Sequence, residues 1–162
     1  EGIKNKLSRS TKLFLAIAIH NVPEGLAVGF AFGVALATQG TVQAASFASA
    51  LGLAIGIGLQ NFPEGAAVSL PMAEELGSRN KAFAYGVFSG IIEPIAALVG
   101  IILASSLTTL MPWFLSFAAG AMMYVVAEEL IPGAHLSEDS HWGTWGVMVG
   151  FVIMMILDVA LG

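Results

Sequence analysis

The chain has 162 residues, of which 57% are hydrophobic and only 10% are charged, with a net charge of −5 at pH 7. Soluble domains carry about 25% charged residues, so this composition excludes a water-soluble surface and indicates an integral membrane protein. The chain contains no cysteine, which excludes a disulfide framework and a thiolate metal site. Any metal ion would have to be bound by histidine, carboxylate, amide or water.

Five apolar segments are long enough to cross a bilayer, which takes about 20 helical residues. They lie at residues 12–37, 44–73, 82–105, 110–131 and 143–161. The sequence therefore predicts an all-α fold, a polytopic membrane helical bundle with five transmembrane helices. We expect residues 1–162 to form one transmembrane domain.

The distribution of positive charge predicts how these helices are oriented. All six basic residues lie in two places, within residues 4–12 and within residues 79–81, a distribution that resembles no nucleic-acid-binding patch. Because positively charged loops stay on the cytoplasmic side, we expect both segments in the cytoplasm and the C-terminus at Gly162 outside it. Residues 1–12 are polar, lack an initiator Met and do not resemble a signal peptide. We expect the chain to begin inside a loop of a longer protein.

A hexapeptide occurs twice within this apolar sequence. Residues 20–25 read His-Asn-Val-Pro-Glu-Gly, and residues 60–65 read Gln-Asn-Phe-Pro-Glu-Gly. Each copy places a proline, which breaks a backbone hydrogen bond, and a carboxylate, which is costly in a bilayer, inside a predicted helix. Intramembrane ionisable residues commonly belong to ion or proton pathways. A single such residue can also be a protonated structural group, but the repetition favours a functional polar site.

Helical geometry predicts which of these side chains can meet. Residues four apart share a face of a helix, so His20 pairs with Glu24 and Gln60 pairs with Glu64. If the first two helices pack together, these four side chains can converge on one point. They would form the first half of a polar centre.

Three further residues can form a second point beside the first. Asn21 and Asn61 lie about 100° round their helices from His20 and Gln60, and Glu93, in the third predicted helix, adds a third buried carboxylate. One imidazole with three carboxylates and three amide oxygens suits Zn, Mn, Fe(II), Co or Cd better than Cu(I). The donors outnumber those that one ion needs, so the site is compatible with two metals.

These residues resemble a known family. The two hexapeptides and residues 89–94, which read Ser-Gly-Ile-Ile-Glu-Pro, look like the fourth, fifth and sixth helices of the ZIP family of divalent-metal transporters. The resemblance covers essentially the whole chain and is strongest to the bacterial GufA-like branch. It implies that the chain comprises helices four to eight of an eight-helix transporter. Helices one to three of the same protein would then be missing partners, and a homodimer is plausible.

The resemblance also implies a binuclear metal centre midway across the membrane. One metal site would comprise His20, Glu24, Gln60 and Glu64. The neighbouring site would comprise Asn21, Asn61 and Glu93, with Glu24 and Glu64 available as bridges. Bacterial relatives often carry Asp where this chain has Asn61, so the second site lacks a charge and the chain could bind one metal or two.

The end of the fourth predicted helix matches a family position near the cytoplasmic exit. Glu128 and Glu129 lie there, and His135 follows in the next loop. The two carboxylates either reach water at a helix end or form an exit path for the metal together with His135. The residues alone leave both readings open.

We therefore predict transport of Zn²⁺, and of Cd²⁺, Mn²⁺ or Fe²⁺, into the cytoplasm across the bacterial inner membrane. Two other classes stay open: a metal-stabilised membrane protein or sensor that transports nothing, and a proton-coupled carrier of organic solutes. An enzyme is not expected, because no nucleophile or oxyanion motif accompanies the ligands. Without metal the carboxylates repel one another, so protons should compete for the site and metal binding should weaken from pH 8 to pH 5.

Overall fold

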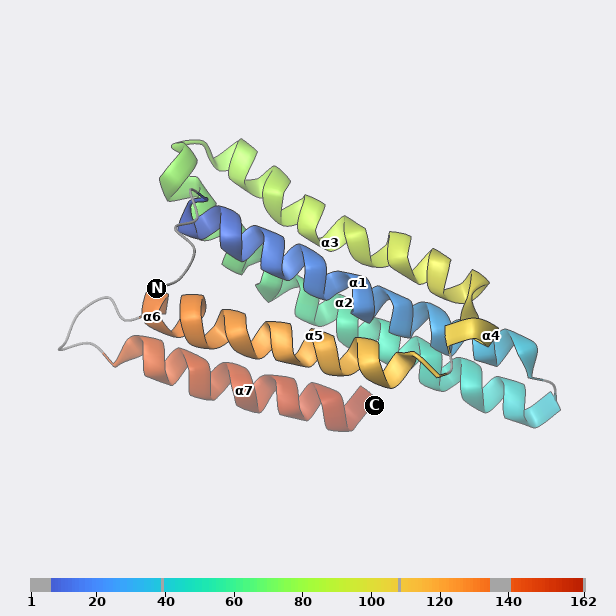
Figure 1. The fold of residues 1–162 in the computed structure, drawn as a ribbon. Helices are drawn as coiled ribbons and strands as arrows, with labels where there is room; N and C mark the ends of the chain where they lie inside the picture. The colour runs from blue at the N-terminus through green and yellow to red at the C-terminus, as the bar shows by residue number, and fades with distance from the viewer. Residues whose placement is uncertain (1–6, 39, 108, 135–140, 162) are drawn as a thin grey trace.

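The computed structural model describes residues 7–38, 40–107, 109–134 and 141–161, and its regular structure there is entirely helical. The elements are α1 (Arg9–Ala37), α2 (Gly40–Leu76), α3 (Arg79–Ile102), α4 (Ala104–Leu107), α5 (Met111–Val125), the π-helix η1 (Val126–Leu130), α6 (Ile131–Ala134) and α7 (Trp142–Leu161) (Figure 1). The predicted all-α fold class is confirmed.

Several of these helices have the length and composition of membrane spans. Within the described residues, four helical stretches are long and apolar enough to cross a bilayer: Arg9–Ala37, Val42–Leu76, Arg79–Ile102 and Met111–Ala134. A shorter apolar stretch, Trp142–Leu157, lies in α7. The chain is an integral membrane protein that folds as a helical bundle.

α1 and α2 extend beyond the apolar segments from which they were predicted, whereas α3 runs from Arg79 to Ile102 rather than over residues 82–105. α1 begins at Arg9 rather than at residue 12, because the Ser8 hydroxyl accepts the backbone N–H of Thr11 at 3.1 Å and caps the helix. α2 continues to Leu76 rather than to residue 73 and stops where Gly77 adopts a left-handed conformation (φ +60°). Hydropathy locates the membrane-embedded part of a helix, whereas caps decide where the helix ends.

The fourth predicted span is a composite rod. α5 passes into η1, where the N–H of Ile131 bonds to the carbonyl of Val126, and then into α6. The rod therefore ends at Ala134 rather than at residue 131. Pro132 does not stop it, because proline is tolerated in the first turn of a helix.

α1 is the central helix of the bundle. It contacts α2, α3, α4 and α5, whereas α7 contacts α2 and α6. In Figure 1 the long helices are roughly aligned, with α1 between α3 and α5 and with α2 behind it. The two copies of the hexapeptide thus lie on neighbouring helices, the first of them on the central helix α1.

Glycine allows α3 to approach α1 unusually closely. A Cβ atom on Gly25 would overlap the backbone carbonyl of Glu93, and one on Gly29 would overlap the carbonyl of Ala97. Membrane helices associate through such small residues. The close approach brings the α3 backbone, including Ser89, against the first hexapeptide.

Candidate metal centre

His20 and Glu24 form the α1 half of the centre. His20 is buried, and its Nε2 atom lies 3.2 Å from Oε1 of Glu24, one helical turn away. The other ring nitrogen, Nδ1, donates to the backbone carbonyl of Ala118 on α5 at 3.0 Å. Because a carbonyl oxygen can only accept, Nδ1 carries the hydrogen and Nε2 faces the carboxylates.

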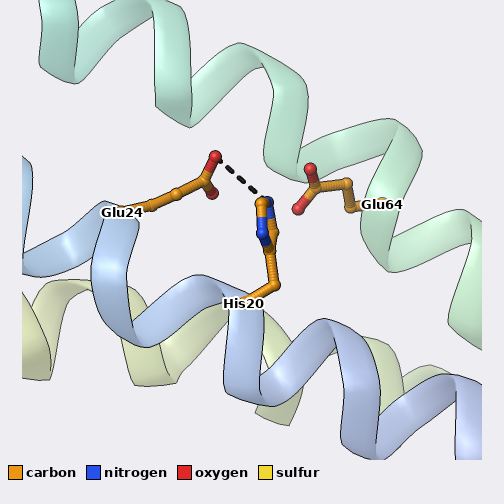
Figure 2. A group of neighbouring side chains, drawn as sticks. All are labelled: His20, Glu24 and Glu64. Atoms are coloured by element: carbon orange, nitrogen blue, oxygen red, sulfur yellow. Dashed lines mark ion pairs between the residues drawn. The ribbon is translucent and has the colours of Figure 1, made fainter. Parts of the chain in front are cut away.

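The α2 half meets the same point from the opposite side. The candidate ligand atoms of His20, Glu24 and Glu64 all lie within 4.8 Å of one another, and Figure 2 shows both carboxylates reaching toward the imidazole. Gln60 donates from Nε2 to Oε1 of Glu24 at 2.7 Å. The structure thus brings together the four side chains expected at the first point.

The two asparagines meet beside this cluster. Asn21 is fully buried, and its Nδ2 atom donates to the backbone carbonyl of Ser89 at 2.8 Å and to Oδ1 of Asn61 at 3.4 Å. The Ser89 hydroxyl in turn donates to the carbonyl of Gly86 at 2.7 Å. The amide pair therefore links α1, α2 and α3.

Glu93 occupies a separate position. It is buried, but it does not belong to the cluster of His20, Glu24 and Glu64 among the described side chains. It lines a cleft of about 480 Å³ between α2 and α3, together with Asn61. The third carboxylate thus borders the cleft beside Asn61 and lies outside the tight cluster of the first point.

The repeat contains buried oxygens that lack a partner. Among the described side chains, three buried polar atoms make no hydrogen bond: Oδ1 of Asn21, Oε2 of Glu24 and Oε2 of Glu64. No lysine or arginine occurs between residues 13 and 78. A buried carboxylate without compensation costs several kcal/mol. Unpaired oxygens beside an imidazole are the donor set that a borderline-to-hard divalent cation requires.

Apolar side chains close the centre in both directions along α1. One buried cluster comprises Leu13, Ile17, Val68, Met72, Ala82 and Val125. The other comprises Leu26, Ala27, Ala96, Leu107 and Met111. Residues 20–24 lie between the α1 members of these clusters, so buried apolar side chains flank the polar groups of the first hexapeptide in both directions along α1.

The residues predicted for an exit path are only partly described. Glu128 is exposed on η1 and lies outside the cluster around His20. The side chain of Glu129 and the whole of His135 lie outside the described residues. Glu128 nevertheless belongs to a π-helix, an element often found at functional sites.

Sequence reasoning missed two contacts to the centre. Both are backbone carbonyls, that of Ala118 on α5 and that of Ser89 on α3. Every residue has a carbonyl, so no side-chain pattern indicates which one accepts a hydrogen bond. Ser89 begins the segment at residues 89–94 that carries part of the family resemblance, but that resemblance did not predict that the Ser89 carbonyl would accept a hydrogen bond from the centre.

Comparison with known proteins identifies the family to which this chain is similar. The family model described as ZIP zinc transporter matches residues 2–158. The chain is 51% identical over 150 residues to zinc transporter ZIP11 of Xenopus tropicalis and 50% identical over 154 residues to ZIP11 of Homo sapiens, which covers 93% and 95% of this chain and 44% of each relative. It is 40% identical over 163 residues to zinc transporter GufA of Myxococcus xanthus, which covers 100% of this chain and 60% of the relative. The chain thus spans about half the length of these curated relatives. No solved structure matches it.

Proposed function

The chain belongs to the ZIP family of zinc transporters, and we propose that its helices form the metal path of a transporter that moves Zn²⁺ and related divalent cations into the cytoplasm. The observation that carries this proposal is the set of three buried, unpartnered oxygens in the repeated hexapeptide. A bound dication would satisfy these oxygens and neutralise the carboxylates, which lie far along the chain from every lysine and arginine.

We assign the first metal to His20, Glu24, Glu64 and Gln60. In support, His20 already directs Nε2 toward both carboxylates, since its Nδ1 atom is used by Ala118. Gln60 currently donates an N–H group to Glu24. It becomes a ligand when its amide turns over and presents the oxygen instead.

We assign a second metal to the trio of Asn21, Asn61 and Glu93. Its support is the unpartnered Oδ1 atom of Asn21 and the cleft that Asn61 and Glu93 line together. Two amides and one carboxylate make this the weaker site, because neutral oxygens compensate less of the charge of a dication. Glu24 and Glu64 each keep a free oxygen with which to bridge the two ions.

The donor set also bears on selectivity and release. Imidazole with carboxylate and amide oxygens accommodates Zn²⁺, Cd²⁺, Mn²⁺ and Fe²⁺. Amide ligands weaken each metal bond and thereby favour departure of the ion. We propose that the ion leaves past Glu128, Glu129 and His135. In support, Glu128 is exposed on the π-helix η1, towards the end of the rod that begins with α5.

We further propose that the protein resides in a bacterial inner membrane with its basic segments in the cytoplasm and its C-terminus on the other side. The identity to GufA and the positive-inside rule support this orientation. N-terminal helices of the same protein would cover the open face of α2, where the Phe62 side chain is 83% exposed. A second copy of the protein is a further candidate partner.

The test is uptake of radiolabelled Zn²⁺ and Cd²⁺ by proteoliposomes that contain the full-length protein. His20→Ala and Glu64→Ala should abolish uptake because they remove ligands from the enclosed cluster. His141→Ala and Glu74→Ala are matched controls, since both side chains are exposed, and they should leave uptake intact. Bound metal without flux would indicate a metal-stabilised protein or a sensor. A protein that binds no metal would contradict the proposal.

A further inference from the structure

The two asparagines of the repeat have the same place in the hexapeptide but different surroundings. Asn21 is completely buried, and its amide nitrogen donates to Ser89 on α3 and to Asn61 on α2. The Ser89 acceptor is a backbone carbonyl, which cannot donate. The nitrogen of Asn21 must therefore face α3, and this contact fixes which way round the amide lies.

The fixed orientation determines where the oxygen of Asn21 points. Because Nδ2 faces the Ser89 carbonyl, Oδ1 at the other end of the amide points away from that carbonyl, and this oxygen is buried without a hydrogen-bond partner. A buried oxygen without a partner is unfavourable. Its desolvation would be compensated when a cation binds.

The oxygen of Asn61 is used differently. It accepts the N–H group of Asn21, and it lies 3.8 Å from the position that a Cβ atom on Gly90 would take. This distance places the Asn61 amide beside Gly90 of α3. Asn61 is only partly buried and borders the cleft. Its oxygen is therefore the second acceptor for the Asn21 N–H group, and it accepts from the side that faces the cleft.

We propose that, in this chain, Asn21 is the metal ligand of the pair and Asn61 is a positioning residue that holds the Asn21 amide with its oxygen toward the metal. This inference rests on the proposed metal centre and revises one part of it: Asn61, counted above among the ligands of the second metal, supports the ligand Asn21 instead of binding the ion itself. It separates two residues that the repeat makes equivalent. It also predicts opposite outcomes for one chemical change made at both positions.

The change is asparagine to aspartate, which adds one negative charge and almost no volume. In Asn21→Asp a carboxylate oxygen replaces the N–H group that faces the Ser89 carbonyl, so two acceptors repel each other and the side chain loses its orientation. In Asn61→Asp the carboxylate accepts the N–H group of Asn21 more strongly than the amide does, because charge-assisted hydrogen bonds are stronger. If both residues were independent ligands, both substitutions would tighten cation binding.

The first experiment compares the Zn²⁺ affinities of these two variants by titration calorimetry on the purified full-length protein. We expect Asn21→Asp to weaken binding about tenfold or more, as for loss of groups that orient metal ligands, and Asn61→Asp to bind at least as tightly as wild type. Tighter binding by both variants would overturn the inference. If the wild-type protein bound no Zn²⁺, the proposed function itself would fail and the inference with it.

A double-mutant cycle tests the same point without Asn21→Asp. If Asn61 acts through Asn21, Asn61→Ala should weaken Zn²⁺ binding about tenfold in the wild-type background and have no further effect in an Asn21→Ala background. Additive losses would show that Asn61 contributes by itself, and would overturn the inference while leaving the metal centre in place. Thermal unfolding of each variant verifies that the affinities refer to folded protein.

Discussion

The two hexapeptides have the same pattern but occupy different environments. In the first copy His20, Asn21 and Gly25 are buried, because α1 is surrounded by α2, α3 and α5. In the second copy Gln60 is only partly buried and Phe62 is 83% exposed. A repeated sequence thus supplies similar donors twice without supplying the same surroundings. The first copy forms the enclosed wall of the centre and the second forms its accessible wall.

The carboxylates of the two copies, Glu24 and Glu64, also have different surroundings, and the largest predicted effect follows from this difference. Glu24 contacts His20 and accepts from Gln60, so it joins both copies, whereas Glu64 contributes to the cluster from α2 alone. We expect Glu24→Gln to weaken Zn²⁺ binding by more than about 100-fold, because even groups that only orient metal ligands contribute about 10- to 100-fold.

The comparison variant is Glu64→Gln, which should weaken binding about tenfold. Both affinities are measured by titration of the full-length protein, with Glu74→Gln, an exposed glutamate of α2, as the control that should leave binding unchanged. Equal losses for the two cluster variants would show that Glu24 does not hold the two copies together.

The glycines that end the two hexapeptides provide the next contrast. A Cβ atom on Gly25 would overlap the carbonyl of Glu93, whereas one on Gly65 would lie 3.6 Å from the carbonyl of Gly86, an ordinary contact. Gly25→Ala should lower the free energy of unfolding by about 1–3 kcal/mol, as expected when a tightly packed interface is overfilled. It should also weaken metal binding, because Ser89 and Glu93 would move away from α1.

Gly65→Ala is the matched control, and alanine favours helix over glycine by about 1 kcal/mol. It should therefore leave stability equal to or above that of the wild type. Thermal unfolding in detergent gives both values. A destabilisation of the same size at both positions would show that α3 does not discriminate between the two copies.

Much of the fold and part of the site could be predicted from the sequence. Apolar length gave the helices, and helical periodicity put His20 over Glu24 and Gln60 over Glu64. Their convergence depended on the first two helices packing together, which the structure shows. These features depend on side-chain pattern over short distances along the chain, and sequence displays such patterns directly.

The remaining features depend on how helices distant in sequence approach each other. The carbonyl of Ala118 orients His20 from α5, and the carbonyl of Ser89 orients Asn21 from α3. Both contacts require a particular depth and rotation of one helix against another. Backbone acceptors have no residue signature, and the place of Glu93 beside the cleft rather than in the cluster has the same origin.

The smallest effect is expected from making the second copy more like the first. Gln60→His places an imidazole opposite His20, one turn from Glu64 and beside Glu24, where a ring N–H can replace the amide donor that now contacts Oε1. Imidazole binds Zn²⁺ more strongly than a neutral amide does, so affinity should rise by several-fold to about tenfold. Tighter binding should slow release, so the maximal rate of Zn²⁺ uptake into proteoliposomes should fall while half-saturation shifts to lower concentration. If uptake instead became faster at saturating Zn²⁺, release would not limit the cycle, and the amide of the accessible copy would have no part in letting the ion leave.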